Sequence, residues 1–373
     1  MTPLSSDLSE VGDARALKAR WQALEERVAA PFFLSWTWIG AWLAGLERPP
    51  LLLAVTGPGG ADIALGLFVP AVESRRGLRV RQMRLHETGD ASRDAVTVEY
   101  NSLLCDPGME AAAWNAALRA LRVRGGWDEI VASGVTDVTA ATLSGLGLHA
   151  HRRAQATSAW VDLAALRERG IGDAEGYVAT LSRNARGQLR RSLRLYGERG
   201  PLRLQPCTDV DAFFAGLGEH HEAKWRTAGR SGATANPAYM AFHRRMIADA
   251  LPRGEVELLR ASAGDEAFGW LYNFVHRGRV LFYLSGFRVE ADNRLKPGLV
   301  THALAVERHL RAGADVYDFM GGDNRYKASL GQPGPGMQAL ALQRRTPALL
   351  LENAARAMKA RLARPQASSS LSQ

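Results

Sequence analysis

The chain has 373 residues, of which 46% are hydrophobic, so it is long enough for about two domains and too apolar to be a disordered protein. Its formal net charge of +9 favours an anionic partner, such as a phosphate-bearing cofactor, an acidic lipid or a nucleic acid. The two cysteines, Cys105 and Cys207, have no CxxC motif or histidine cluster near them, which argues against a disulfide scaffold and against a zinc site.

Targeting signals are absent from the sequence pattern. The segment 1–18 has neither a basic region followed by an apolar one nor any feature of a leader peptide, and no stretch approaches the roughly 18 apolar residues of a membrane span. We therefore expect a cytoplasmic protein. Its basic charge leaves open a peripheral position at the inner face of the membrane.

The first part of the chain predicts an α/β unit of about 160 residues. Its opening helix, residues 13–30, has an apolar face, and Ser35 is suited to cap a second helix that ends near residue 46. Trp36, Trp38 and Trp42 in this helix are expected mainly to pack in the core. Further strands are predicted at 51–56, 61–72, 94–104, 127–133 and 159–163, with a helix at 109–123.

An arginine-rich helix is predicted within residues 176–200, with Ser182 as one candidate N-cap. Four arginines recur on one stripe of this helix, and leucines fall on another. The stripe is either a solvated basic face or a cradle for phosphate, because guanidinium groups bind phosphate oxygens in pairs. The four are Arg183, Arg186, Arg190 and Arg194.

The next predicted helix, residues 213–228, gathers His220, His221, Lys224 and Trp225. A histidine on a helix is more often structural than catalytic, and two adjacent histidines cannot ligate one metal ion from the same helix face. The following segment, residues 229–237, is rich in Gly, Ser and Ala and is a candidate lid over an acceptor site.

The sequence pattern predicts secondary structure most clearly in the last part of the chain, from residue 256 to residue 320. Strands at 256–261, 267–276 and 280–287 follow one another, with Gly278 in a tight hairpin turn. Pro297 then begins an amphipathic helix, and residues 316–320 alternate as a strand. The N-terminus of such a helix presents open N–H groups and a positive dipole end, which suit a phosphate-bearing ligand.

This unit resembles a known family. The residues that carry the resemblance are Gly286-Phe287, Arg294, Pro297-Gly298, Gly313, Asp318-Phe319, Gly322-Asp323 and Tyr326-Lys327. They are similar to the C-terminal signature of the CelD/BcsL-like acyl-CoA N-acyltransferases, a branch of the GNAT superfamily with two GNAT-like halves that is related to the Fem peptidyl transferases. The opening run of Pro31, Phe32 and the tryptophans is similar to the start of that family.

The resemblance implies an α/β fold of two tandem GNAT-like halves, with mixed sheets flanked by helices. It implies a degenerate half at 1–165, a half with the acyl-CoA site at 166–345, and a C-terminal helix with a disordered tail at 346–373. No tightly bound cofactor is expected, because acyl-CoA would be a co-substrate. Its phosphates would bind at Arg294, Lys296, Pro297, Gly298 and Leu299, although this sequence departs from the common GNAT pattern Q/R-x-x-G-x-G/A.

A GNAT enzyme catalyses direct attack of an amine on a thioester, which requires removal of a proton, stabilisation of an oxyanion and departure of a thiolate. In this reading Tyr326 protonates the leaving thiolate, and Lys327 binds an anionic group or polarises the acyl carbonyl. The catalytic candidates are Asp323, Tyr326, Lys327, His221 and Asp318, and the substrate-binding candidates are Arg186, Arg190, Lys224, Trp225 and Tyr283.

Three functions remain open at this point. The first is a bacterial acyl-CoA-dependent N-acyltransferase acting on an envelope amino sugar or on an amine-bearing lipid such as a long-chain base. The second is a Fem-like aminoacyl-tRNA-dependent ligase, which lacks support because no long coiled-coil insertion is present. The third is a non-catalytic binding protein with a GNAT fold. A role in binding DNA is least expected, since no helix-turn-helix or zinc-finger pattern occurs.

Overall fold

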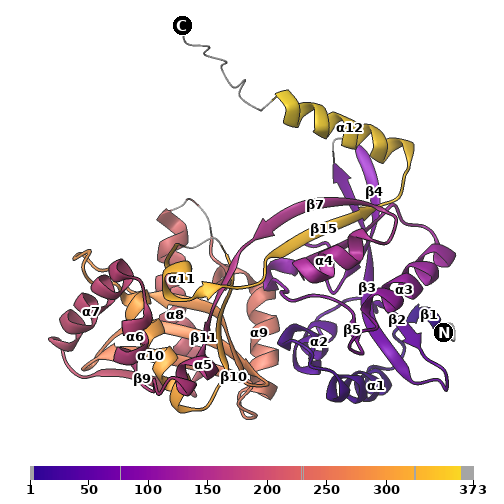
Figure 1. Cartoon of the computed structure of the whole chain (residues 1–373). Helices are drawn as coiled ribbons and strands as arrows, with labels where there is room; N and C mark the ends of the chain where they lie inside the picture. Colours follow the sequence, from indigo (N-terminus) through magenta and orange to yellow (C-terminus); the bar gives the residue numbers. More distant parts are fainter. Residues whose placement is uncertain (1–3, 76, 228, 230, 323–324, 363–373) are drawn as a thin grey trace, which may run out of the picture.

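The computed structural model of the chain describes residues 4–75, 77–227, 229, 231–322 and 325–362. They form two mixed sheets that lie side by side, each flanked by helices (Figure 1). The first sheet has the order β1 (Ser5–Glu10), β2 (Leu51–Thr56), β3 (Asp62–Arg75), β4 (Leu78–Leu85), β6 (Glu129–Thr136), β15 (Met337–Gln343) and β7 (His149–Ala156), with β5 (Leu104–Cys105) beside β3. The second has the order β14 (Gln332–Pro333), β8 (Ser158–Asp162), β13 (Val316–Gly321), β12 (Arg279–Phe287), β11 (Glu266–His276), β10 (Val256–Ala263) and β9 (Leu202–Pro206).

The two sheets are built on the same plan, and we call the units around them the first half and the second half. In each, four antiparallel strands lead into a helix and then into a strand that pairs in parallel with the fourth. The helix is α3 (Glu110–Arg124) before β6 in the first half and α10 (Pro297–Arg311) before β13 in the second. The predicted α/β class with mixed sheets and two similar halves is therefore confirmed.

The halves exchange strands, which the sequence did not indicate. Strand β8 follows β7 in the chain but pairs with β13 of the second sheet, whereas β15 comes from the C-terminal part of the chain and pairs with β6 and β7 (Figure 1). The two crossings touch, since the Gly334 N–H donates to the Ser158 carbonyl. Neither sheet is therefore confined to one side of residue 165, because β8 joins the second sheet and β15 joins the first. The boundaries 1–165 and 166–345 stay a prediction.

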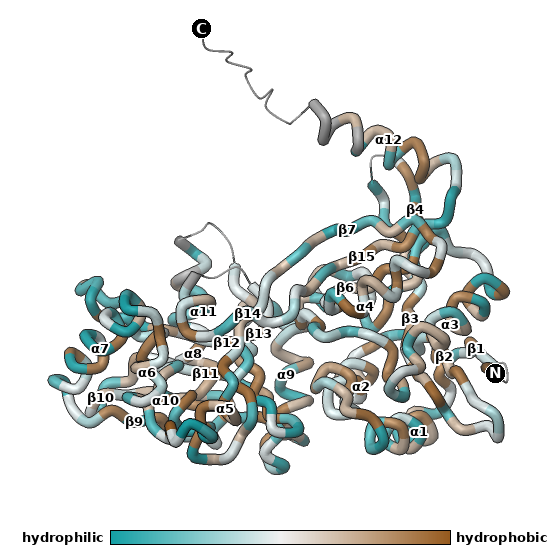
Figure 2. Tube along the Cα trace, in the orientation of Figure 1, coloured by the Kyte–Doolittle hydropathy of each residue, from teal (hydrophilic) through white to brown (hydrophobic). Residues whose placement is uncertain are grey.

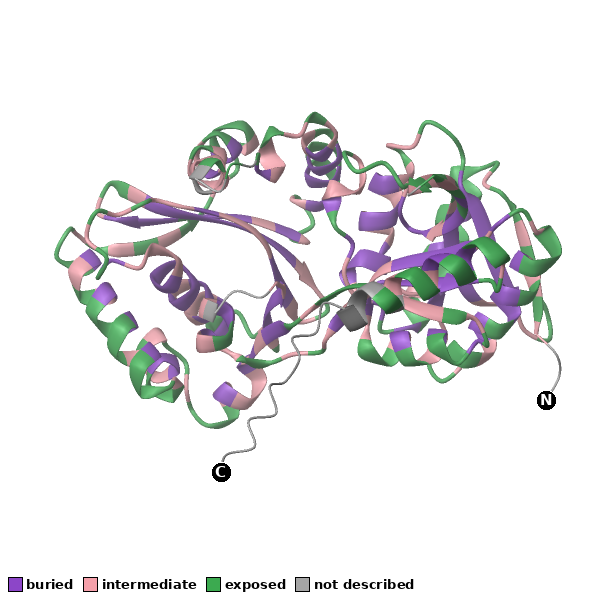
Figure 3. Ribbon diagram, turned by 90° about the horizontal axis from the view of Figure 1, so that it is seen from above, coloured by how far each residue is buried: buried purple, intermediate pink, exposed green. Residues whose placement is uncertain are grey.

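Four helices share one hydrophobic core with residues of both sheets: α1 (Ala14–Arg27), α2 (Trp36–Leu43), α8 (Val210–Thr227) and α9 (Pro237–Ala250). Trp38 of α2 lies in this core with Phe242 of α9 and Phe274 of β11. Figure 3 shows buried strands inside each half and exposed faces on the outer helices. The expected apolar face of the first helix is confirmed. The expected packing of Trp38 and Trp42 in the core is confirmed as well.

The outer faces of the sheets are covered separately. On the first sheet lie α3 and α4 (Asp137–Ser144), and on the second lie α5 (Leu163–Glu168), α6 (Ala174–Thr180), α7 (Arg183–Gly197) and α10. The helix α12 (Pro347–Leu362) follows β15, as expected for the region after residue 345. The tail expected to be disordered, 363–373, lies outside the described residues. Among the described helices, none is long and apolar enough to cross a membrane.

Several predicted elements differ from the structure for local reasons. The arginine-rich helix begins after its predicted N-cap, since Ser182 accepts the N–H of Ala185 at the start of α7, and the short helix α6 before it was not predicted separately. The strand expected at 94–104 is absent apart from β5, because the Asp94 carboxylate binds the N–H groups of Thr88 and Gly89 and holds a compact turn. The expected hairpin turn at Gly278 is confirmed.

Candidate functional site

The two parallel strands of the second half stop pairing after a short stretch, and we call the region between their unpaired backbone edges the cleft. Strands β12 and β13 pair only at Arg279–Leu281 with Val316–Asp318 and then diverge. Tyr283 is an extra residue in β12, since Tyr272 pairs with Leu284 and Asn273 pairs with Phe282. Such a β-bulge increases the local twist of a strand and is common beside active sites. The backbone edges beyond Leu281 and Asp318 therefore do not pair with each other.

Helix α10 begins where β12 ends. Its Gly298 lies against Phe287, so that an added Cβ would be 3.1 Å from the phenyl ring. Pro297 has no N–H, and the N–H groups of Gly298 and Leu299 donate to no described residue, as expected in the first turn of a helix. These two groups and the helix dipole make an anion-binding end. The position predicted for phosphate binding is thus a helix N-terminus beside the cleft.

The two basic side chains predicted at this helix end differ in their surroundings. The Arg294 guanidinium is exposed and bound to Asp292, through hydrogen bonds of 2.7 to 3.0 Å. Lys296 is half-buried at the N-cap position, and its backbone N–H donates to Ser192 of α7 at 2.8 Å. This hydrogen bond fixes the start of α10 on α7, while Arg294 remains an exposed ion pair that an anion can reach.

His221 of α8 lies against β12. Its Nδ1 is 3.1 Å from the Ser285 carbonyl oxygen, and the Trp225 indole N–H donates to its Nε2 at 3.0 Å. Because an indole N–H can only donate, these contacts fit a neutral imidazole that carries its proton on Nδ1. The structure thus brings together two predicted site residues, His221 and Trp225, beside the diverging part of β12. The side chain of Lys224 lies outside the described residues.

The short helix α11 (Arg325–Leu330) closes the other side of the cleft. The Tyr326 ring stacks on the imidazole of His302 from α10, and Lys327 donates to the Gly321 carbonyl at 2.7 Å while its ammonium lies over Phe282. Both predicted residues therefore lie between the ends of β12 and β13. The predicted catalytic residue Asp323 lies outside the described residues.

His302 fills the gap between the strands, and the sequence reading did not single it out. Its ring contacts Phe282 of β12 and Phe319 of β13, and its Nδ1 lies 3.0 Å from the Tyr317 hydroxyl. Its Nε2 is buried and has no hydrogen-bond partner among the described residues. Burial, assisted by the charge of Lys327, lowers the pKa of His302 to about 3. The imidazole is therefore neutral and contributes packing to the floor of the cleft.

Asp318 joins the two halves at the closed end of the cleft. Its carboxylate accepts from the Tyr100 hydroxyl of the first half, from Arg279 at 2.9 Å and from the Met320 N–H at 2.7 Å. Burial, followed by the charge of Asp318 and its hydrogen bond, raises the pKa of Tyr100 well above its ordinary value, so the phenol stays protonated. The predicted catalytic candidate Asp318 is thus fully hydrogen-bonded in an inter-half junction.

The remaining predicted substrate residues do not form one group. The Tyr283 hydroxyl donates to the Val96 carbonyl, and its ring packs in the shared core. On α7, which is hydrophilic over most of its length (Figure 2), Arg186 binds two backbone carbonyls at the end of α6 and Arg190 pairs with Glu175. No group of three or more potential metal ligands occurs among the described residues.

The sequence reading missed Glu99, which enters this site from the first half. Its Oε2 accepts the Gly321 N–H at 2.8 Å, at the end of β13, and Lys327 donates to the carbonyl of the same glycine. Burial has the largest effect on the pKa of this carboxyl and raises it to about 7, because the Gly321 N–H and the Lys327 charge offset burial only in part. The sequence around Glu99 does not indicate a site residue, because the residues on either side of it alternate between apolar and polar as in a strand.

In the first half, the equivalent gap is closed. Strands β4 and β6 pair only from Gln82 with Glu129 to Arg84 with Val131, and Asn101 occupies the space beyond. The Asn101 N–H donates to the Gly134 carbonyl at 2.9 Å, and its side-chain amide donates to the Leu85 carbonyl at 3.1 Å. Asn101 thus links β4 and β6 by hydrogen bonds, whereas in the second half the His302 side chain packs between β12 and β13.

We expect Gly134→Ala to lower the free energy of unfolding by about 2–4 kcal/mol. Gly134 has a φ of +67°, and an added Cβ would be 2.0 Å from the Val98 carbonyl oxygen, so the substitution displaces the segment that closes the gap. Urea unfolding measures the effect. The control is Gly147→Ala, where φ is +73° but the space is open, and which should cost only about 1 kcal/mol. Equal costs for the two variants would show that closure of the gap contributes nothing.

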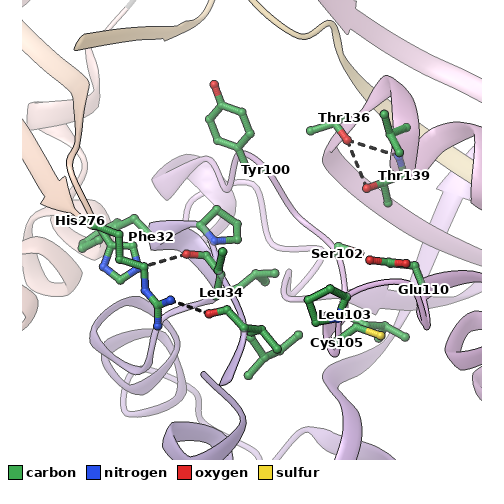
Figure 4. Close-up of a pocket in the computed structure, with 18 of the residues that line it drawn as sticks. Phe32, Leu34, Tyr100, Ser102, Leu103, Cys105, Glu110, Thr136, Thr139 and His276 are labelled. Carbon is green, nitrogen blue, oxygen red and sulfur yellow. Dashed lines mark hydrogen bonds between the residues drawn. The ribbon is translucent and has the colours of Figure 1, made fainter. Parts of the chain in front are cut away.

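A cavity of about 630 Å³ lies between the halves next to the Tyr100–Asp318–Arg279 junction. Figure 4 shows Phe32 and His276 on one side, Thr136, Thr139 and Glu110 on the other, and Tyr100 between them. Its size and apolar lining fall within the range of small-molecule sites, which occur preferentially between domains. The apolar lining includes Phe32, Leu34, Leu103, Trp114 and Leu281.

The comparisons with known proteins agree with this geometry. Residues 183–328 match the family model described as an acetyltransferase (GNAT) domain, and this range contains β12, α10, β13 and most of the cleft. The chain has a tandem GNAT-like fold. No curated protein matches the sequence significantly.

Three solved structures share the fold over nearly the whole chain. The crystal structure of FemX aligns with a TM-score of 0.55 and 10% identity over 92% of this chain and 99% of that one. L-PGS from Bacillus licheniformis aligns with a TM-score of 0.52 and 12% identity over 93% and 98%, respectively. The C-terminal domain of a putative lysylphosphatidylglycerol synthetase from Agrobacterium fabrum aligns at 0.51 and 12% over 94% and 97%. At these identities the likeness concerns the fold of the tandem GNAT-like chain and not its substrate.

Proposed function

We propose that the protein is an acyl-CoA-dependent N-acyltransferase whose reaction site is the cleft of the second half. The observation that carries the proposal is the divergence of β12 and β13 after three paired residues, with the open first turn of α10 at the end of β12. A thioester pantetheine arm can pair with the unpaired strand edges, while the pyrophosphate binds at Gly298 and Leu299 beside Arg294 and Lys296. Acyl-CoA is thus a co-substrate and not a resident cofactor.

The residues around the cleft suit direct transfer. A neutral amine attacks the thioester carbonyl, and the developing oxyanion needs hydrogen-bond donors at fixed positions. Tyr326 stays protonated because burial raises the pKa of its phenol above the ordinary value, so it can give a proton to the thiolate. Lys327, fixed by Gly321, supplies positive charge at the same end. His221 and Asp323 remain candidates for contact with the acceptor.

The cavity between the halves supports an acceptor with an apolar body. Its wall of Phe32, Leu103 and Leu281 suits an alkyl chain better than a sugar, because a sugar would leave hydroxyl groups without partners there. We therefore favour an amine-bearing lipid, such as a long-chain base, over an envelope amino sugar. Synthesis of a bacterial cell-envelope component at the inner face of the membrane would fit this acceptor and the net charge of +9.

Binding of the donor is tested by thermal unfolding with free CoA, acetyl-CoA and palmitoyl-CoA. A ligand present at a hundredfold excess over its Kd stabilises the native state by about 2.7 kcal/mol, so the midpoint should rise with at least one of them. The rise should be reduced in Lys296→Ala and in Arg294→Ala. Arg311→Ala is the control, because Arg311 is exposed at the opposite end of α10 and pairs with Glu307. No rise with any CoA species in the wild-type protein would refute the proposal.

A Fem-like aminoacyl-tRNA-dependent ligase is the second candidate. It is supported by the alignment with FemX over most of both chains and by the exposed arginines of α7. Two of the four arginines on this stripe of α7 already form ion pairs, however: Arg190 pairs with Glu175, and Arg194 pairs with Glu198. Stabilisation by an aminoacyl-tRNA mimic, with none by CoA species, would favour this candidate. If neither ligand stabilises the protein, a non-catalytic binding role becomes the better explanation.

A further inference from the structure

The segment 96–101 carries a carboxylate from the first half into the cleft of the second. Val96 accepts the Tyr283 hydroxyl from β12, Glu99 accepts the Gly321 N–H from β13, and Tyr100 donates to Asp318 on the same strand. The three contacts place the segment across the opening between β12 and β13. The Glu99 carboxylate is therefore held at the mouth of the cleft, near the ends of the diverging strands.

The backbone around Glu99 is strained on both sides of this contact. Thr97 and Tyr100 have φ values of +31° and +52°, and Met320, which precedes the glycine bound by Glu99, has +58°. Non-glycine residues in such conformations are strained and cluster at functional sites. Three of the five non-glycine positions with positive φ among the described residues thus lie within three residues of either Glu99 or Gly321.

One oxygen of this carboxylate remains available. Oε2 accepts the Gly321 N–H, whereas Oε1 accepts no hydrogen bond from a described residue. The charged and titratable groups that face it are Lys327 on α11, Asp318 on β13, Tyr283 on β12 and its neighbour Tyr100. Burial raises the pKa of this carboxyl to about 7, with a smaller contribution from the charge of Asp318, and the Gly321 N–H and the charge of Lys327 offset the rise only in part. A pKa near 7 suits a general base.

We infer that Glu99 is the proton acceptor for the amine in the acyl transfer, supplied by the first half to the reaction site of the second. The inference rests on the proposed N-acyltransferase function. The Glu99 carboxylate takes one proton from the acceptor ammonium, and the neutral amine then forms the C–N bond at the thioester carbonyl. The C–S bond breaks, Tyr326 gives its proton to the CoA thiolate and takes the second amine proton in its place, and Glu99 releases its proton to solvent.

This role gives the first half a function, although its own parallel strands are linked by Asn101. Asn101, which closes that cleft, and Glu99, which reaches the other, lie on one short segment. The link from Asn101 to Gly134 and Leu85 fixes this segment to the first sheet. The first half thereby acts as the support that holds the carboxylate at the second cleft.

The test is the pH profile of turnover for wild type and Glu99→Gln, measured as CoA release from the best-bound acyl-CoA with octylamine or glucosamine as acceptor. We expect kcat/KM at pH 7.5 to fall by about a hundredfold to a thousandfold in the variant. The acid limb near pH 7 in the wild-type profile should disappear. Glutamine retains the oxygen that accepts the Gly321 N–H, so stabilisation by acyl-CoA should be unchanged.

Glu87→Gln is the matched control. Glu87 is also a carboxyl whose pKa burial raises, but it lies in the first half, bound to Ser133 and near Arg84, and away from the second cleft. Its substitution should leave the turnover per folded molecule and the acid limb unchanged. A similar loss in both variants would show a general effect of removing a buried carboxyl and would overturn the inference.

Thermal unfolding gives a readout that does not depend on turnover. The pKa of Glu99 is raised in the native state, so the native state binds more protons between its ordinary value and pH 7, and stability falls as pH rises through this window. Glu99→Gln should therefore raise the unfolding midpoint at pH 8 and not at pH 4. Turnover within threefold of wild type with the acid limb intact, or no gain in stability at pH 8, would overturn the role of Glu99 while donor binding stands. Absence of both donor binding and turnover in the wild-type protein would refute the proposed function and, with it, this role.

Discussion

Trp38→Ala is expected to lower the free energy of unfolding by about 4 kcal/mol and to destabilise both halves together. The side chain is 1% exposed in α2. Its ring centroid lies 4.6 Å from Phe33, 4.8 Å from Phe242 of α9 and 5.8 Å from Phe274 of β11, so its removal opens a cavity between elements of the two halves. Because the halves share this core and exchange strands, neither can keep its packing when the other unfolds.

The measurement is urea unfolding followed by both tryptophan fluorescence and far-ultraviolet circular dichroism. The two probes should give one coincident transition in the wild type and in the variant, with a lower midpoint in the variant. Trp36→Ala is the control, since Trp36 lies in the same helix but is only half-buried, and it should cost less than half as much. Two separate transitions in the wild-type protein, or equal costs of the two substitutions, would contradict a shared core.

Elements with strong local signals were predictable from the sequence. The helix after Pro297, the N-caps at Ser35 and Ser182 and the turn at Gly278 were all found, because each depends on residues within a few positions of one another. The anion-binding end of α10 could be proposed for the same reason. It requires only that a helix begin at a proline after a loop that carries Arg294 and Lys296.

Contacts between distant segments could not be predicted in this way. Strands β8 and β15 are both short and apolar, and nothing in either sequence indicates which sheet it joins. Around Glu99, the alternation of Val96, Val98 and Tyr100 indicates a strand, because it carries no sign of the positive φ at Tyr100. The tertiary contacts of Tyr100 with Asp318 and of Glu99 with Gly321 override the local preference.

The difference between local signals and contacts of distant segments also explains where the candidate site residues lie. Tyr326, Lys327 and His221 were proposed from a resemblance within one part of the chain, and the structure places all three at the cleft. Tyr283 was also a substrate-binding candidate, but its bulge turns the side chain into the core shared with the first half. The direction of a side chain next to a bulge depends on the register between strands, which the sequence does not encode locally.

Glu129→Gln is expected to lower the free energy of unfolding by about 2–4 kcal/mol at pH 7. The Glu129 carboxylate is fully buried at the start of β6. Its oxygens accept four hydrogen bonds: two from Arg75, one from Gln82 and one from Gln343 of β15. A glutamine amide would place its N–H₂ group opposite two of these donors. It would also leave the half-buried Arg75 with only Glu73 and Glu352 as charged partners.

The pH dependence of the effect has a definite sign. Burial alone would raise the pKa of Glu129, but the hydrogen bonds from Arg75 and Gln343 and the charge of Arg75 outweigh it, and the pKa lies below its ordinary value. A carboxyl with a lowered native pKa contributes stability above its unfolded pKa and loses that contribution as the pH falls through the native one. The difference in unfolding free energy between wild type and Glu129→Gln should therefore be largest near pH 7 and should shrink below pH about 4.

Asp128→Asn is the matched control for this experiment, because Asp128 precedes Glu129 and also binds an arginine, Arg81, but does so at the surface. It should cost about 1 kcal/mol at most, since exposed ion pairs contribute little. Because Gln343 belongs to the strand that crosses from the second half, loss of the Glu129 cluster should also loosen β15 in the first sheet. Hydrogen exchange of the β15 amides should thus accelerate in Glu129→Gln and not in Asp128→Asn. Unchanged exchange in both variants would mean that pairing with β6 and β7 alone holds the exchanged strand.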